Sequence, residues 1–142
     1  MKRPFFSVII PTFNQSNFLD KSLRSVLDQS FKSFEIIVVD NFSTDSTEKI
    51  IKSFKNKIVY KKIKNHGIIA KSRNKGIQLS KGKWVAFLDS DDLWTRNKLN
   101  EVYKKAQKNE YDVICNDEWI KYGQQPISSL WSYGPYKNNF CK

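Results

Sequence analysis

Hydrophobic residues along most of this chain alternate between short unbroken runs and a spacing of three to four positions. Short runs are typical of buried strands, and the wider spacing is typical of one face of a helix. Leu19, Leu23, Val26 and Leu27 show the helical spacing, whereas residues 34–39 form the nearly continuous run expected of a parallel strand covered on both faces. The pattern predicts strands at residues 6–10, 34–39, 58–63, 84–88 and 112–115, and helices over residues 19–27, 45–54, 69–80 and 99–106.

Local signals mark the ends of several of these elements. Pro11 is expected to end the first strand, because a proline has no N–H to donate. Residues 45–48 resemble a capping box and should open the second helix. Lys81 and Gly82 form a stop for the third helix. After Gly123 the pattern gives way to polar and aromatic residues.

The alternation of strands and helices predicts an α/β domain with a mainly parallel sheet and right-handed crossovers. We expect one domain over residues 1–142, with a core at about residues 5–120 and an aromatic, polar tail at residues 121–142. Ligands bind at the carboxyl ends of parallel strands. The loops after the first and second strands should therefore share one edge of the sheet with the residues that follow the strand at 84–88.

Composition is that of a globular chain, with 39% hydrophobic residues in 142 positions. No apolar run approaches the roughly 20 residues that span a bilayer. Lys2 and Arg3 precede a short apolar run without a cleavage site, which argues against a signal peptide. Cys115 and Cys141 form neither a disulfide framework nor a zinc pattern. A cytoplasmic protein is expected.

The net charge of +11 favours contact with a polyanion such as a nucleotide, a nucleic acid or an anionic lipid. Lysine supplies most of this charge, and the lysines of residues 49–64 fall on a predicted helix and strand, as on a solvated face. Arginine clusters with interleaved aromatic residues are missing from the sequence, which argues against a nucleic-acid partner. A peripheral position at the inner face of a membrane stays open.

An acidic cluster, Asp89-Ser90-Asp91-Asp92, follows directly after the apolar run at residues 84–88. Carboxylates this close repel one another unless a cation lies among them. One of the three could instead cap the next helix, but three exceed what a cap needs. The cluster predicts a divalent metal site that takes a phosphate-bearing ligand.

Two loops at the same edge carry residues suited to a nucleotide. Pro11-Thr12-Phe13-Asn14 suits a base stacked on Phe13, although a plain turn with a core phenylalanine has the same pattern. Asp40 or Asn41 could bond a base edge or a ribose hydroxyl, or the segment could serve helix capping, as expected for Asp45.

A third loop, at residues 65–67, precedes a helix that carries Arg73 and Gly76. Arg73 could pair with a phosphate through two hydrogen bonds. Gly76 should allow the helix to approach the sheet closely. His66 is interpreted as a loop histidine rather than a catalyst, because no serine or cysteine partner motif accompanies it.

These segments together resemble the N-terminal, nucleotide-sugar-binding half of a family 2 glycosyltransferase with the GT-A fold. The resemblance covers residues 5 to 120, in family-like order and spacing. It rests on residues 7–14, 38–45, 72–76, 81–82 and 87–92.

The resemblance implies an inverting transfer of a sugar from a nucleoside-diphosphate sugar, usually UDP- or dTDP-linked, to an acceptor hydroxyl. Asp91 and Asp92 would bind Mn²⁺ or Mg²⁺ as part of a DxD-type motif. The implied acceptor is a glycan or a lipid-linked chain in cell-surface polysaccharide synthesis. The implied nucleotide-sugar contacts are Pro11, Thr12, Phe13, Asn14, Asp40, Asn41, Arg73, Asp89, Ser90 and Asp91.

The sequence departs from the family in two respects. Many members carry an aspartate where this chain has Asn41, and the asparagine amide can donate as well as accept, so the preferred base stays open. The family's acceptor-binding half and catalytic base lie beyond the length of this chain, so no catalytic residue is assigned. The alternative to an active enzyme is a truncated, non-catalytic module that binds a nucleotide-sugar.

Overall fold

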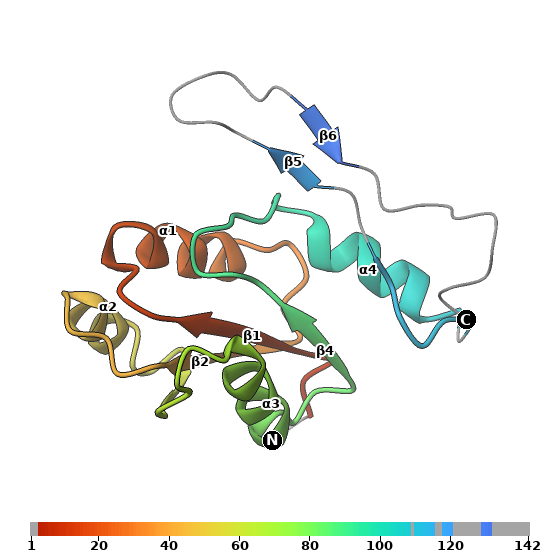
Figure 1. Ribbon diagram of the computed structural model, residues 1–142. Helices are drawn as coiled ribbons and strands as arrows, with labels where there is room; N and C mark the ends of the chain where they lie inside the picture. The colour runs from red at the N-terminus through yellow and green to blue at the C-terminus, as the bar shows by residue number, and fades with distance from the viewer. Residues whose placement is uncertain (1–2, 109, 116–117, 121–128, 132–142) are drawn as a thin grey trace. The chain divides into compact units, whose positions relative to one another are not determined.

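The computed structural model describes residues 3–108, 110–115, 118–120 and 129–131 (Figure 1). The chain divides into two compact units, residues 1–99 and residues 100–142. The expectation of one domain over the whole chain stays a prediction. Within the described residues, no helix is both long enough and apolar enough to cross a membrane.

The first unit is built on a four-stranded, all-parallel sheet in the order β3-β2-β1-β4. Helix α3 packs against β1 and β2, and α1 and α2 contact each other on the other side of the sheet, as right-handed crossovers require (Figure 1). The predicted α/β class is confirmed. The elements are β1 (Phe6–Thr12), α1 (Ser16–Leu27), β2 (Phe34–Asp40), α2 (Thr47–Ser53), β3 (Val59–Lys62), α3 (Ile69–Leu79) and β4 (Trp84–Phe87).

The core lies around the two central strands. All seven residues of β1 and the last five of β2 are buried, as predicted for strands covered on both faces. Helix α1 adds Leu19, Leu23 and Val26, each fully buried, so the helical spacing in the sequence marked the inward face correctly. The strands β1 and β2 run in register from Phe6 opposite Phe34 to Thr12 opposite Asp40, so they end together.

Strand β1 does not end at Pro11, as predicted, but continues through it to Thr12. The Ile9 carbonyl accepts a hydrogen bond from Leu88 on the β4 side, and the Thr12 carbonyl accepts one from Asn41 on the β2 side. Because hydrogen-bonding groups alternate sides along a strand, Pro11 faces the β4 side, where the pairing has already ended at Ile9 opposite Phe87. Its missing N–H therefore falls where the ladder with β4 stops, while the ladder with β2 continues to Thr12.

Strand β4 differs from the buried strand that the sequence predicted. It is the outermost strand of the sheet next to β1, and its four residues are only partly covered, with Phe87 44% exposed. Leu88, immediately after the strand, is buried. The apolar run at residues 84–88 therefore forms an outer strand, and only the residue after its carboxyl end lies in the core.

The second unit contains most of α4 (Lys98–Ala106), which confirms the fourth predicted helix. The strand predicted at residues 112–115 is wrong: these residues have no regular structure, and Val113 is 56% exposed. An antiparallel pair forms instead from β5 (Glu118–Ile120) and β6 (Ser129–Trp131). Apart from β6, the predicted tail at residues 121–142 lies outside the described residues.

Gly76 confirms the predicted close approach of α3 to the sheet. A Cβ atom there would lie 2.3 Å from Cγ2 of Ile9, which is fully buried. Gly76→Ala should overpack this contact, and after the gain in helix propensity the expected net loss is about 1–2 kcal/mol of unfolding free energy. The control is Asn74→Ala, at an exposed position of the same helix, which should cost nothing. Urea unfolding measures both, and equal stability of the two variants would contradict the close-contact role of Gly76.

Candidate functional site

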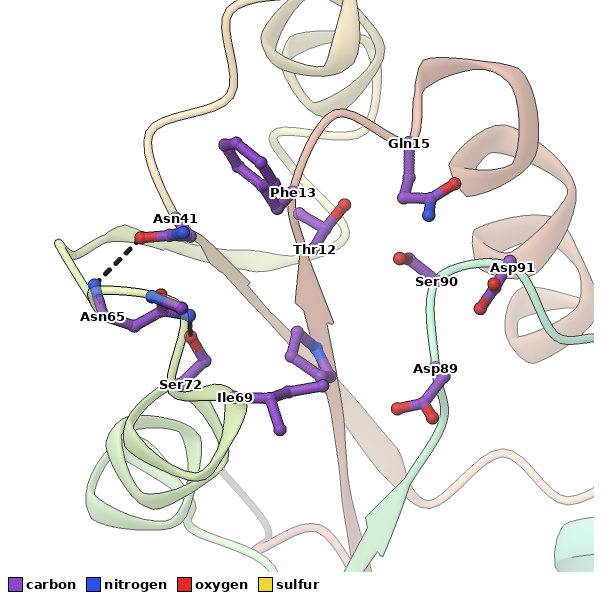
Figure 2. Close-up of a pocket in the computed structure, with 12 residues that line it drawn as sticks. Thr12, Phe13, Gln15, Asn41, Asn65, Ile69, Ser72, Asp89, Ser90 and Asp91 are labelled. Atoms are coloured by element: carbon purple, nitrogen blue, oxygen red, sulfur yellow. Dashed lines mark hydrogen bonds between the residues drawn. The ribbon is translucent and has the colours of Figure 1, made fainter.

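A pocket of about 360 Å³ opens at the carboxyl edge of the sheet (Figure 2). Four segments form it: the loop after β1, the end of β2, the loop into α3, and the turn after β4. Of the predicted contacts, the structure brings seven together here, and their roles toward a ligand stay predictions. The lining residues are Pro11, Thr12, Phe13, Gln15, Asn41, Asn65, Gly67, Ile69, Ser72, Asp89, Ser90 and Asp91.

Phe13 and Thr12 differ sharply in exposure although they are neighbours. The Phe13 side chain is 52% exposed at the pocket, so it does not belong to the core. Thr12 is only 5% exposed, and its Oγ1 has no hydrogen-bond partner within the described part of the chain. A buried hydroxyl without a partner is uncommon, and Thr12 itself belongs to the wall of the pocket.

Asn41 is held at the pocket by the loop that leads into α3. Its Oδ1 accepts a hydrogen bond from the Asn65 backbone N–H at 2.9 Å (Figure 2). Asn65 in turn donates from Nδ2 to Ser72 Oγ and accepts the Gly67 N–H, each at 2.9 Å. Since an N–H must face an oxygen, these bonds fix the orientation of the Asn41 amide and leave its Nδ2 as the donor available to a ligand.

The acidic cluster divides its carboxylates between the pocket and its surroundings. Asp89 and Asp91 line the pocket, and Asp92 does not. Asp89 is paired with Arg73, whose Nη2 lies 2.8 Å from Asp89 Oδ1. Arg73 is therefore connected to the pocket through the Asp89 carboxylate. Its buried Nε has no hydrogen-bond partner within the described residues.

Carboxylate oxygens are the ligands that Mg²⁺ and Mn²⁺ prefer. Within the residues that the structure describes, no three His, Cys, Asp or Glu side chains are grouped to hold a metal ion. Asp91 with a neighbouring acid supplies at most a partial set of ligands. A metal ion here would need oxygens from a ligand such as a diphosphate to complete its coordination.

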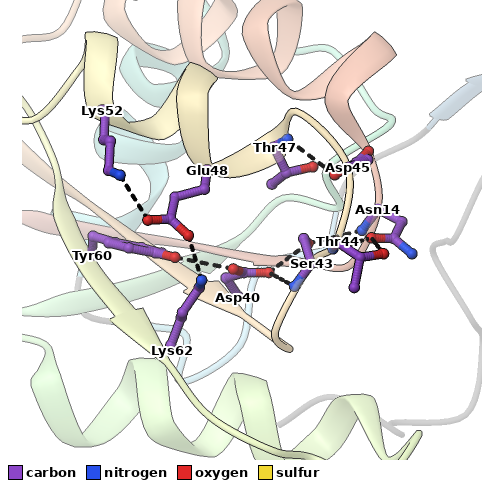
Figure 3. Close-up of polar contacts among 10 residues, drawn as sticks. All are labelled: Asn14, Asp40, Ser43, Thr44, Asp45, Thr47, Glu48, Lys52, Tyr60 and Lys62. Atoms are coloured by element: carbon purple, nitrogen blue, oxygen red, sulfur yellow. Dashed lines mark hydrogen bonds and ion pairs between the residues drawn. The ribbon is translucent and has the colours of Figure 1, made fainter.

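Asp40 is not among the residues that line the pocket, and its expected contact with a base or ribose stays a prediction. Figure 3 shows the polar contacts that it makes. It is fully buried, and its Oδ1 accepts the N–H and the hydroxyl of Ser43 at 3.0 and 2.5 Å. Its Oδ2 accepts the Tyr60 hydroxyl at 3.0 Å. Burial, reinforced by this bond to Asp40, raises the pKa of Tyr60. Asp40 thus supports the loop that follows β2.

Asn14 also has a structural place, in a set of bonds that join the loop after β1 to the loop after β2 (Figure 3). Its backbone N–H donates to Ser43 Oγ at 2.9 Å, and its Oδ1 accepts the Thr44 N–H at 2.8 Å. Next along the chain, the Ser16 N–H donates to Asp45 Oδ2 at 3.0 Å. Asn14 adopts φ 52°, a conformation that asparagine tolerates. Together these contacts fix the loop that carries Phe13.

Asp45 and Glu48 do not form the predicted capping box. Helix α2 begins at Thr47, and the side chain of Ser46 makes no capping bond. Asp45 Oδ1 instead accepts the Thr47 N–H at 3.0 Å, and hydrogen bonding with Thr47, then Ser16, holds the pKa of Asp45 well below its usual range. Glu48 turns outward to Lys62 and to Lys52, the latter at 2.9 Å.

Comparison with known proteins identifies the family of the chain. Residues 7–132 match the profile of Glycosyl transferase family 2. The chain belongs to this family. The parallel sheet with helices on both sides is the GT-A fold, as predicted.

The chain is 39% identical over 122 residues to the poly(ribitol-phosphate) beta-N-acetylglucosaminyltransferase TarP of Staphylococcus aureus, covering 82% of this chain and 36% of TarP. The structure of S. aureus TarS 1-349 in complex with UDP-GlcNAc matches with a TM-score of 0.75 and 30% identity, over 86% of this chain and 37% of that one. The mannosyltransferase PcManGT of Pyrobaculum calidifontis, in complex with GDP-Man and Mn²⁺, matches with a TM-score of 0.63 and 26% identity, over 73% and 32%. The chain thus spans less than half the length of each of these relatives.

The pocket of this family 2 chain also contains residues to which the sequence analysis gave no role. Gln15, Ile69 and Ser72 are single residues in a turn and a helix, and no periodic pattern in the sequence indicates that they line a pocket. Asn65 and Gly67 carried a usable signal, because an Asn-X-Gly turn directly before a helix at the ligand-binding edge favours a polar wall.

The ion pairs of Glu48 predict a pH dependence of stability. Hydrogen bonds from Lys62 and then Lys52 lower the pKa of Glu48 from 4.5 to about 2. The folded state therefore favours the charged carboxylate, and the resulting stabilisation is complete above pH 4.5 and is lost as the pH falls through about 2. Glu48→Gln should be less stable than the parent at pH 7, and this difference should shrink between pH 4.5 and 2. Urea unfolding at several pH values measures the difference, and a gap that stays constant down to pH 2 would contradict the assignment.

Proposed function

We propose that the pocket binds a UDP- or dTDP-linked sugar together with Mn²⁺ or Mg²⁺, and that the sugar is transferred with inversion to an acceptor hydroxyl. The observation that carries the proposal is the division of the pocket into two walls. One wall offers an exposed aromatic ring, a buried hydroxyl without a partner and an oriented amide, and the other offers carboxylates. A nucleoside diphosphate has the matching halves, a flat base and an anionic diphosphate.

At the base end, Phe13 would stack on a pyrimidine, Thr12 Oγ1 would gain a partner, and Asn41 Nδ2 would donate to a carbonyl oxygen of the base. The TarS structures with UDP and UDP-GlcNAc favour uridine as the nucleoside. Pro11, Ser90 and Asp89 complete the walls around the rest of the donor in this proposal.

At the diphosphate end, Asp91 would hold the metal ion with Asp92, and Asp89 would contact the ribose or the sugar. The complex of PcManGT with GDP-Man and Mn²⁺ supports a divalent ion, because that structure is similar to this one. When bound, the ion would stabilise the negative charge that develops on the leaving diphosphate. Arg73 would act on this end by holding Asp89 in place.

The proposed acceptor is a glycan or a lipid-linked chain of the cell surface, in line with the printed name of TarP. Synthesis of such polymers from cytoplasmic nucleotide-sugars would bring the protein to the inner face of the membrane as a peripheral protein, which its net charge of +11 favours. No catalytic base is assigned. Turnover with an acceptor would separate an active enzyme from a module that only binds the donor.

The role of Phe13 predicts a loss of affinity without a loss of stability. Phe13→Ala should weaken UDP binding by roughly 1–3 kcal/mol, the usual contribution of stacking between a base and an aromatic ring. Phe18→Ala is the matched control, because Phe18 is 50% exposed on α1 and does not line the pocket. Calorimetry measures both, and an unchanged affinity in Phe13→Ala would remove the base from this position.

The metal ion and the nucleotide should bind cooperatively. Mn²⁺ or Mg²⁺ should raise the affinity for UDP, and UDP should raise the affinity for the metal by the same factor. Asp91→Asn should lose most of this gain, whereas Asp28→Asn, which removes a charge at an exposed position after α1, should retain it. UDP is titrated with and without metal in all three proteins. If chelation leaves the parent's affinity unaltered, or if both variants behave alike, the acidic cluster is a structural turn.

A further inference from the structure

The acidic residues lie in a segment without helix or strand, residues 88–97, and yet its backbone is closely bonded. The partners come from helix α1 and the residues just after it. Ser22, Ser25 and Gln29 lie three and seven positions apart, so they share one face of the helix and its continuation. Ser22 and Gln29 are fully buried, which is unusual for polar side chains without a structural task.

Each of the three side chains holds a different part of the segment. Gln29 bonds its far end, donating to the Thr95 carbonyl at 2.7 Å and accepting the Leu99 N–H at 2.9 Å. Ser25 Oγ accepts the Trp94 N–H at 3.2 Å. Ser22 bonds the acidic residues themselves.

The Ser22 hydroxyl lies among three carbonyl oxygens of the acidic cluster. It contacts the Asp92 carbonyl most closely, and those of Ser90 and Asp89 lie at 3.1 and 3.5 Å. A hydroxyl carries a single proton, so it donates to one of these carbonyls at a time. Three carbonyls can meet one donor only if the backbone curls around it, and the Asp92 N–H closes this curl by donating to the Asp89 carbonyl at 3.1 Å.

This arrangement opposes the repulsion among the carboxylates. Three aspartates within four positions favour an extended segment that separates their charges. With the carbonyls drawn inward to Ser22, Asp89 and Asp91 lie at the pocket. Without the hydroxyl, the Ser90 and Asp92 carbonyls would lose this donor, and the curled backbone would lose these stabilising bonds.

We infer that Ser22 is a positioning residue that presents the acidic cluster to the metal ion and the diphosphate, an inference that rests on the proposed function. Ser22 touches neither ligand. It acts through the backbone of residues 89–92, and it therefore controls the metal-dependent part of nucleotide binding. The base end, which depends on Phe13, Thr12 and Asn41, is independent of it.

The test measures UDP affinity by calorimetry with Mn²⁺ and with a chelator, in the parent, Ser22→Ala and Ser25→Ala. In Ser22→Ala the gain in affinity from Mn²⁺ should fall by about tenfold, the factor that corresponds to a lost buried hydrogen bond. Its metal-free UDP affinity should stay at the parent's value, which also shows that the variant is folded. Ser25→Ala removes a hydroxyl from the same helix face. The Ser25 hydroxyl bonds Trp94, so the gain in UDP affinity from Mn²⁺ should be unchanged in this variant.

Ser22→Cys is a second variant that preserves the volume and leaves a weak donor, and it should show an intermediate loss. Two results would overturn the positioning role alone. One is a gain in UDP affinity from Mn²⁺ that is intact in Ser22→Ala, and the other is a gain that is lost equally in Ser25→Ala. A parent that binds UDP without any metal gain, or does not bind UDP, would overturn the proposed function and this inference with it.

Discussion

The common end point of β1 and β2 is the constraint on which the rest of the site depends. Thr12 lies opposite Asp40, and all of β1 and the last five residues of β2 are buried. The two loops that follow therefore leave the sheet side by side. This proximity lets Asn14 and Ser43 bond directly, and it places Phe13 and Asn41 on the same pocket. A shift of one residue in register would turn every side chain of one strand to the opposite face.

Bonds between side chains and backbone fix several of the segments that form the pocket. Asp40 fixes Ser43, Asn65 fixes the orientation of Asn41, and Ser22 fixes the acidic cluster. Each of these three supporting side chains is buried. The loops of a binding site are held in a precise geometry in this way, because each loop is hydrogen-bonded by at least one polar side chain of the rigid scaffold.

The sequence predicted the sheet and the location of the site because both follow from local patterns. Apolar runs marked the strands, and the acids after residues 84–88 had to meet the loops after β1 and β2 at one edge. The direction of Asp40 could not be predicted in the same way. A carboxylate at a strand end can face a ligand or its own loop, and Tyr60, twenty positions away, helps to decide between them. The strand expected at 112–115 failed for a related reason, since pairing depends on a distant partner and β5 found one in β6.

Pro11 has an effect on a strand other than its own. It faces the β4 side one step beyond the last bonded pair, where a continued parallel ladder would require its N–H to donate to the carbonyl of Leu88. Because proline has no N–H, the ladder stops there, and the backbone after Leu88 is released from the sheet. Pro11, a residue of β1, therefore ends the pairing of the neighbouring strand β4. It determines where β4 ends, and with that, where in the chain the aspartates can begin to turn.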